Sequence, residues 1–350
     1  MGVLFDLQTH SAISDGELTP TELIVYAREC DLQIISITDH DTIDGYIEII
    51  SASKKYGMAV IPGIELSVED VFEGKKVNNH LLVYGFNPEK LDSKLIEHFE
   101  NDKIAKNNKS EKICKLSQQN PIELIDGSQI KPTFDQIKKF TKIDNVIHFG
   151  EIGAYIASRI NKLHQKETGK NEIIIGMYEA LGIFLKGEQK FIDQYSDILK
   201  NYVTSYIGDV GWHTEYNPEL HSILHMDEAL QYANEANGIT IIAHPGEKGK
   251  MTRAKTVEEK LNSDERYLIE KKKKGLKGIE PYSPKHSPKK INYFLQFAVK
   301  HDLLIGAGSD YHGDNYSPDR ELGHFSKRNS KNKMRFPFKG VKRLIEAIKD

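Results

Sequence analysis

Cysteine is scarce in this sequence, with only two among 350 residues. Cys30 and Cys114 lie far apart, which excludes a disulfide framework and a paired-cysteine metal clip. Each falls in a stretch with a helical pattern, so we expect both to be buried, reduced thiols.

Long hydrophobic runs are also absent. No stretch approaches the roughly 20 apolar residues that a transmembrane helix needs, and the first residues lack the basic start and apolar core of a signal peptide. The formal net charge is only -3, which gives no general attraction to nucleic acid or to an anionic membrane. We therefore expect a cytoplasmic protein with no membrane partner and no stable duplex nucleic-acid partner.

Short apolar strands alternate with helices at both ends of the chain. The strongest helix start is Thr19-Pro20-Thr21-Glu22, where Thr19 can cap the helix and Glu22 completes a capping box. The expected strands are apolar segments at residues 3–7, 34–38, 59–65, 80–84, 238–243, 278–280 and 303–307. Continuous apolar strands between helices favour parallel strands covered by helices. Seven such units predict an α/β fold, a distorted (β/α)7 barrel similar to a TIM barrel.

The alternation stops near Asn87 and resumes near Asp227. The segment between them is rich in Lys, Asn and Gln, has helical patches and is about the size of a small domain. We predict that residues 1–90 and 226–350 form the barrel and that residues 91–225 form a mostly helical insertion domain.

Residues that can bind metal border most of the expected strands. In chain order they are Gln8, His10, Asp15, His40, Glu65, His80, His244, Asp310 and His312. Because active-site residues of such barrels gather where strands end, we expect these side chains at one rim. Imidazole and carboxylate groups suit Zn, Mn and Fe, and this many ligands exceed the need of a single ion. The pattern predicts two or three divalent metal ions.

Five motifs resemble those of the PHP (polymerase and histidinol phosphatase) superfamily. In chain order they are Asp6-Leu7-Gln8-Thr9-His10 with Ser14-Asp15-Gly16, Ile37-Thr38-Asp39-His40-Asp41, Pro62-Gly63-Ile64-Glu65, Ala243-His244-Pro245-Gly246 and Gly308-Ser309-Asp310-Tyr311-His312. The set is similar to that of bacterial PHP phosphoesterases that act on nucleotides and short RNA ends. The resemblance covers roughly residues 1–90 and 225–325.

The resemblance implies three metal positions. The first would use Gln8, His10, Glu65 and Asp310, the second Asp15, His40 and His244, and the third Glu65 as a bridge with His80 and His312. Clustered cations lower the pKa of a bridging water and neutralise phosphoryl oxygens, so a metal-bridging hydroxide would be the nucleophile, with no further catalytic residue. Asp39 and Asp41 are expected to orient imidazoles rather than to bind metal.

Gln8 departs from the His-x-His that normally opens the family's first motif. A glutamine carbonyl is a neutral, harder and weaker donor for Zn than an imidazole. The first position is therefore expected to be empty, weakly held or filled by a harder ion, so Mn, Zn, Fe and Mg all stay candidates.

Three residues are candidates for contact with substrate, namely His148, Lys109 and His286. The resemblance places a histidine near position 148 and basic residues on the helix that carries Lys109, which also carries Lys103 and Lys106. His286 follows the sixth expected strand. Each has a structural alternative, as a packed histidine or as a lysine on a solvated face.

The C-terminal stretch, residues 324–343, carries eight Lys or Arg residues, no acid and several Phe residues. Aromatic residues among basic ones suit single-stranded nucleic acid. The alternative that we favour is a tail that packs its Phe side chains on the barrel.

The motifs together predict a metal-dependent phosphoesterase with a phosphorylated small-molecule or short-oligonucleotide substrate. The resemblance implies a nucleotide-like substrate, such as a 3',5'-bisphosphonucleotide, a nucleoside monophosphate or the 5' end of a short RNA. Two alternatives stay open at this stage. One is a phosphatase of the histidinol-phosphate type, and the other is a degenerate nucleotide-binding protein without hydrolysis, because Gln8 replaces the usual His.

Overall fold

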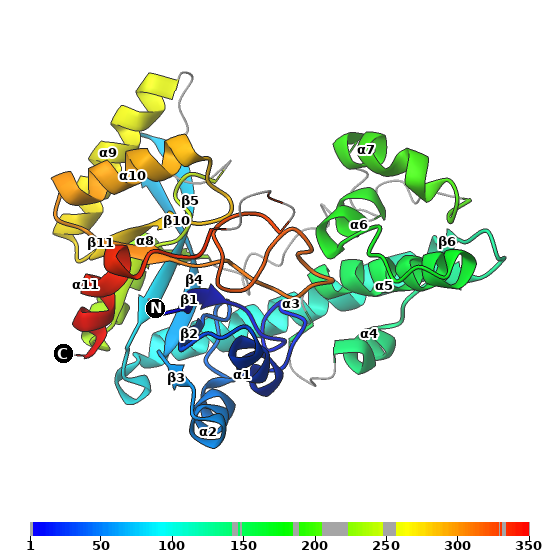
Figure 1. Ribbon diagram of the computed structural model, residues 1–350, viewed down its shortest axis with the longest axis horizontal. Coiled ribbons are helices and arrows are strands. Elements are labelled where there is room, and N and C mark those ends of the chain that lie inside the picture. The colour runs from blue at the N-terminus through cyan, green and yellow to red at the C-terminus, as the bar shows by residue number, and fades with distance from the viewer. Residues whose placement is uncertain are drawn as a thin grey trace.

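The computed structural model describes residues 3–141, 146–147, 149–184, 189–204, 223–247, 257–328, 330 and 334–349. Figure 1 shows a part that contains the long strands, on the left, and a helical part on the right. The strands are β1 Phe5–Thr9, β2 Ile34–Ile37, β3 Ala59–Val60, β4 Gly63–Phe72, β5 Lys75–Tyr84, β6 Ile122–Glu123, β7 Gln129–Ile130, β8 Leu224–His225, β9 Ile239–Ile242, β10 Gly278–Tyr282 and β11 Leu304–Ala307. The helices are α1 Pro20–Glu29, α2 Tyr46–Tyr56, η1 Pro88–Lys90, α3 Ser93–Gln119, α4 Phe134–Thr141, α5 Phe149–Thr168, α6 Met177–Phe184, α7 Gln189–Leu199, α8 Met226–Glu235, α9 Val257–Lys273, α10 Pro288–Lys300 and α11 Phe338–Lys349.

The first helix begins where the capping motif predicts. The Thr19 side chain accepts a hydrogen bond from the Glu22 backbone N–H, and the Glu22 carboxylate accepts one from the Thr19 N–H. These bonds satisfy two backbone donors that the first turn of α1 would otherwise leave unpaired. The prediction of this capping box is confirmed.

The third and fourth expected strands differ from the prediction. The expected strand at 59–65 is divided into β3 and β4 by Ile61-Pro62, because a proline has no N–H for a strand ladder. The expected strand at 80–84 is only the second half of β5, which runs antiparallel to both β4 and β9. Glu73 and Gly74 both have positive φ, 49° and 72°, which permits a two-residue hairpin turn between β4 and β5. The expectation of uniformly parallel strands is therefore wrong at β5.

The described strands form a mixed α/β fold with two main sheets. One sheet has the order β1-β2-β3 and the other β11-β10-β9-β5-β4-β8. Isolated bridges join the sheets at Thr9–Tyr311 and at His40–Glu65. The pairing among described residues thus gives two sheets that meet at their strand ends rather than one continuous ring of seven strands.

A glycine allows the end of β11 to approach β1. A Cβ atom at Gly308 would lie 2.2 Å from the Cβ of Gln8, closer than side-chain atoms can pack. The Asp310 N–H donates to the Gln8 carbonyl at 2.9 Å, and the His10 N–H donates to the Tyr311 carbonyl at 2.9 Å. These contacts bring the first and last predicted ligand motifs together.

Helix α3 connects the two parts of the molecule, as Figure 1 shows. Its first half contributes Leu95 and Phe99 to the hydrophobic core beside β4, β5 and α8. Its second half contributes Ile113 and Cys114 to a separate core built with α5, α6 and α7. The helical part therefore has a hydrophobic core of its own.

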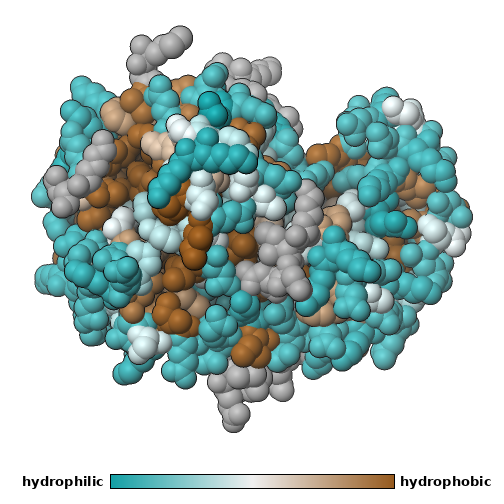
Figure 2. Space-filling model, turned by 90° about the horizontal axis from the view of Figure 1, so that it is seen from below, coloured by the Kyte–Doolittle hydropathy of each residue, from teal (hydrophilic) through white to brown (hydrophobic). Residues whose placement is uncertain are grey.

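The phenylalanines of the basic C-terminal stretch pack on the sheet-containing part. The Phe336 ring lies 5.6 Å from the Phe5 ring and 5.9 Å from the Phe325 ring, between centroids. This is the packing alternative that the sequence analysis favours. On the face that Figure 2 shows, hydrophobic side chains gather on the sheet-containing part, while the helical part is mostly hydrophilic. No helix in the described part of the chain is both long and apolar enough to cross a membrane.

Candidate metal centre

The nine residues predicted to bind metal converge on one region of the sheet-containing part. Most follow the carboxyl end of a strand, in the segments after β1, β2, β9 and β11. Glu65 and His80 instead lie within the antiparallel pair β4 and β5. All nine are buried or half-buried.

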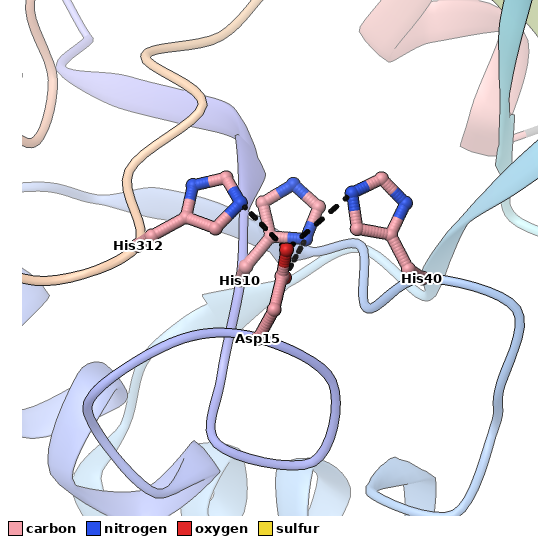
Figure 3. A group of neighbouring side chains, drawn as sticks. All are labelled: His10, Asp15, His40 and His312. Carbon is pink, nitrogen blue, oxygen red and sulfur yellow. Dashed lines mark ion pairs between the residues drawn. The ribbon is translucent and has the colours of Figure 1, made fainter. Parts of the chain in front are cut away.

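The first group of side chains surrounds Asp15. Figure 3 shows the Asp15 carboxylate directed at the imidazoles of His10, His40 and His312. The nearest oxygen-to-nitrogen distances are 3.6 Å to His10 Nδ1, 4.0 Å to His40 Nε2 and 3.3 Å to His312 Nε2. We call these four residues the Asp15 group.

The second group surrounds one oxygen of Glu65. Glu65 Oε1 lies 2.5 Å from His80 Nδ1 and 3.4 Å from His244 Nε2, and His40 completes the group. We call Glu65, His40, His80 and His244 the His80 group. The resemblance implied that His244 would join Asp15 and that His312 would join His80. In this structure His312 lies nearer to Asp15, and His244 lies nearer to Glu65.

The third group lies around the other oxygen of Glu65. His10 Nε2 is 3.2 Å from Glu65 Oε2 and 3.2 Å from Asp310 Oδ1. Gln8 donates from its amide nitrogen to Glu65 Oε2 at 2.6 Å. We call Gln8, His10, Glu65 and Asp310 the Gln8 group, and it has the composition that the resemblance implies for the first position.

These residues fit divalent cations because several of their buried polar atoms form no hydrogen bond. Within the described part of the chain, both ring nitrogens of His10 and of His244, Nδ1 of His40 and Oε1 of Gln8 are buried without a hydrogen bond. Buried polar atoms are rarely left unpaired, because the loss of hydration costs free energy. Coordination of metal ions by imidazole and carboxylate would satisfy these atoms.

Two of these residues adopt a backbone conformation that side chains rarely take. The φ angles are 26° at His244 and 54° at Asp310. Such strain costs roughly 1–3 kcal/mol per residue and persists where the surrounding structure enforces it. At His244 the backbone N–H donates to the buried Glu280 carboxylate at 2.9 Å, which holds the strained turn.

The electrostatics keep the central carboxylates ionised. Burial alone would raise the pKa of Glu65, but His40, His80 and hydrogen bonds with further histidines outweigh it and hold this pKa well below its usual value. Burial is likewise outweighed at Asp15, mainly by His312 and His40, and its pKa is well below normal. The centre therefore has a strong preference for positive charge.

Asp39 and Asp41 hold loops in place and belong to none of the three groups. Asp39 accepts hydrogen bonds from the Ser11 N–H and hydroxyl at 2.7 Å and 2.6 Å, and from the Ser14 hydroxyl at 2.8 Å. Asp41 accepts from the Ser67 N–H at 2.7 Å and from its hydroxyl at 2.8 Å. Their structural contacts thus fix the segments beside His40 rather than its imidazole.

Sequence reasoning missed three charged residues at the centre. Lys285 and Arg320 both lie against Asp310, and Glu247 lies 3.0 Å from His244 Nδ1. They follow strands, as the predicted ligands do, but no motif singled them out.

A small cleft opens beside the Asp15 group. Asp15, His40, and Lys103 and Lys106 of α3 line this cleft, together with the acidic residues Asp41, Asp44, Glu100 and Asp102. Lys106 Nζ lies 2.5 Å from Asp102 Oδ2 and 3.5 Å from Asp41 Oδ2. The predicted substrate residue Lys109, on the same helix, is not among the residues that line this cleft.

Both ring nitrogens of His286 contact backbone atoms. Its Nε2 accepts the Gly246 N–H at 2.8 Å, and its Nδ1 lies 2.8 Å from the Pro281 carbonyl. Burial, as the main cause, lowers the pKa of His286 to about 4, so the ring is neutral at pH 7. With both nitrogens paired, His286 fixes the turn after His244 rather than facing the cleft. The third substrate candidate, His148, lies outside the described residues.

Known proteins resemble this chain over most of its length. The chain matches the family model described as PHP domain over residues 6–277. A 3',5'-nucleoside bisphosphate phosphatase of Chromobacterium violaceum is 23% identical over 323 residues, which cover 91% of this chain and 90% of that protein. A 5'-3' exoribonuclease of Haemophilus influenzae is 32% identical over 109 residues, which cover 31% of this chain and 38% of that protein.

Solved structures share the fold. One described as a metal-dependent phosphoesterase of Bifidobacterium adolescentis matches with a TM-score of 0.64 and 21% identity, over 99% of this chain and 97% of that one. An amidohydrolase of Chromobacterium violaceum, with bound sulfate and no metal, matches with a TM-score of 0.61 and 21% identity over the same shares. The predictions of a PHP relationship and of a phosphoesterase family are confirmed, and the chain belongs to the PHP domain family.

Proposed function

We propose that this protein hydrolyses a phosphate ester of a nucleotide-like substrate with the help of two or three divalent ions. The observation that carries the proposal is the set of three adjoining ligand groups, which share His10, His40 and Glu65. Divalent ions bound there would supply a nucleophilic water near neutral pH and neutralise phosphoryl oxygens. Mn, Zn, Fe and Mg are the candidate ions.

The buried carboxylates of the chain give this centre its negative charge, and the fold sets the distances between its side chains. Asp15, Glu65 and Asp310 contribute the negative charge that attracts cations, and each is buried beside imidazoles. Because the side chains come from strand ends in both sheets, their separations are fixed by the fold rather than by one flexible loop.

The cleft beside the Asp15 group is the proposed substrate-binding site. Lys103 and Lys106 would place positive charge beside a phosphate of the substrate, in a cleft that Asp15 and His40 also line. A bisphosphonucleotide has a second phosphate that such lysines can bind. The relative that is named for this substrate matches across nine tenths of both chains, whereas the exoribonuclease match covers about a third of this chain.

A phosphate-release assay tests the proposal. Purified protein would be supplied separately with Mn, Zn, Fe or Mg and with a 3',5'-bisphosphonucleotide, a nucleoside monophosphate, a short 5'-phosphorylated RNA or histidinol phosphate. We expect metal-dependent release from the nucleotide substrates. Faster release from histidinol phosphate would establish the other phosphatase class. Nucleotide binding without release under every metal condition would establish a binding protein.

We also propose the domain division of the sequence analysis, with residues 91–225 as an insertion into a distorted β/α barrel made of residues 1–90 and 226–350. The separate hydrophobic core that residues from 113 to 203 form supports this division. The isolated bridges between the two sheets support a barrel-like closure.

A further inference from the structure

Two cations share one oxygen of Asp310. Lys285 Nζ lies 2.7 Å and Arg320 Nη1 2.6 Å from Asp310 Oδ2. Their side chains are only 17% and 13% exposed. The other oxygen, Oδ1, faces His10 Nε2 at 3.2 Å. Protein charges therefore already neutralise one side of this carboxylate.

The network extends from Lys285 to a second acid. Lys285 Nζ lies 3.1 Å from Glu247 Oε2, which in turn lies 3.0 Å from His244 Nδ1. Arg320 also donates to the backbone carbonyl of Asp310, which fixes the strained turn. Lys285 and Arg320 are thus built into the centre and do not extend from its surface.

The other carboxylates at the centre are surrounded differently. Within the described part of the chain, the ion pairs of Asp15 and Glu65 are all with histidines. A histidine that binds a metal ion is neutral, so it leaves the charge of a neighbouring carboxylate available to that ion. The Gln8 group also contains an amide, which is uncharged and already donates to Glu65.

We propose that Lys285 and Arg320 act as fixed positive charges at the Gln8 group, so that this group holds its divalent ion most weakly of the three. A cation beside a buried site lowers its affinity for another cation, because the interior screens charge poorly. The two side chains also hold the Asp310 carboxylate in position. This inference rests on the metal centre of the proposed function.

A metal titration without substrate tests the inference. Metal-stripped protein would be titrated with Mn²⁺ while electron paramagnetic resonance measures the free ion. We expect two ions to bind tightly and a third to bind at least about 10-fold more weakly, the size of effect typical for altered metal surroundings. Anomalous diffraction from crystals given limiting Zn²⁺ should show the lowest occupancy at the Gln8 group.

Two variants separate the effect of the fixed positive charge from the effect of the weak amide donor. Lys285→Met removes a fixed charge, and Gln8→His restores a stronger donor, so each should tighten the weakest site by about 10-fold or more. Lys274→Met is the matched control, because Lys274 pairs with Asp227 away from the centre and should leave all three affinities unchanged. If Lys285→Met does not fold, Gln8→His alone still tests which site is weakest.

Several results would overturn the inference. One is equal affinity for Mn²⁺ at all three sites, and another is lowest Zn²⁺ occupancy at the Asp15 group or the His80 group. A third is unchanged metal affinity in Lys285→Met together with a raised KM for the nucleotide substrate. The last result would make Lys285 a substrate contact. Since the metal titration and the diffraction measurement need no turnover, a protein that binds metal as expected but hydrolyses nothing would refute the proposed function and not this inference.

Discussion

Asp15 supplies the carboxylate of the Asp15 group, and the imidazoles of His10, His40 and His312 surround it. If Asp15 and His312 hold the same ion, Asp15→Ala and His312→Ala should each remove about one equivalent of metal. Turnover should fall at least about 100-fold in each, because losing a ligand exceeds the 10–100-fold cost of losing a supporting contact. Elemental analysis beside phosphate release measures both effects.

The double variant makes this test specific. Residues that act as one unit give effects that do not multiply, so the Asp15 and His312 double variant should be about as slow as either single variant. Rate losses that multiply would show that the two residues serve different ions. The same comparison between Asp15 and His244 should give larger combined losses, because the structure places His244 in the His80 group.

Lys103 and Lys109 offer a second comparison of single residues. Both lie on α3, but only Lys103 lines the cleft, where its Nζ lies 3.0 Å from Asp44. We expect Lys103→Met to raise KM for a nucleotide about 10-fold, since a hydrogen bond to a charged group contributes roughly 1.5–3 kcal/mol. Lys109→Met should change KM little. Steady-state kinetics on both variants decides which lysine contacts substrate, and a larger effect at Lys109 would contradict the assignment of the cleft.

Among the secondary-structure elements, the contact of β11 with β1 depends on a glycine. In Gly308→Ala the new methyl group would meet the Gln8 Cβ and backbone N at 2.2 Å and 2.7 Å, so one strand must move. Such overpacking typically costs about 1–3 kcal/mol. Urea unfolding should show this loss, and metal content should fall because Gln8 and Asp310 separate. A variant with normal stability and full metal content would show that the strands can adjust freely.

Asp227 links α8 to the end of α9. Burial alone would raise its pKa, but hydrogen bonds from Lys271, at 2.8 Å, and from Lys274 outweigh this and lower the pKa. A carboxylate whose folded-state pKa lies below its unfolded value stabilises the fold above the unfolded pKa, near 4. That stabilisation is lost as the pH falls through the folded-state pKa.

Asp227→Asn should therefore lower the free energy of unfolding at pH 7 by up to about 1 kcal/mol, since the side chain is partly exposed and screened by solvent. The difference from the unmodified protein should shrink as the pH falls below about 4. Asp302→Asn is the control, because Asp302 forms an exposed pair with Arg343 and should matter little. A difference that stays constant with pH would show that the Asp227 charge is not responsible.

For the whole molecule, bound metal ions should hold the two sheets together. The Asp15 group joins residues that follow β1 and β2 to His312, which follows β11 of the other sheet. A ligand that binds only the folded state stabilises it by about 2.7 kcal/mol at 100 times its Kd. Removal of metal by a chelator should lower the melting temperature, and added Mn²⁺ or Zn²⁺ should restore it. No change on chelation would mean that the sheets are held by packing alone.

The sequence alone determined which residues form the centre and which local elements carry them. The capping residues at Thr19 and Glu22 act over a few positions, and the apolar strand segments and the ligand motifs are equally local. Such signals can be read from neighbouring residues without knowledge of the fold. That is why all nine candidate ligands could be predicted before their positions in the fold were known.

Only the tertiary structure decided which of those residues meet. His312 lies beside Asp15 because the end of β11 meets the end of β1 at the Thr9–Tyr311 bridge. His244 lies beside Glu65 because β5 pairs with both β4 and β9. Lys285 and Arg320 reach Asp310 from separate loops, and no short motif records such a contact. Distances across a sheet depend on strand order and direction, which form only when the whole chain packs, so the grouping of ligands could not be read from their spacing.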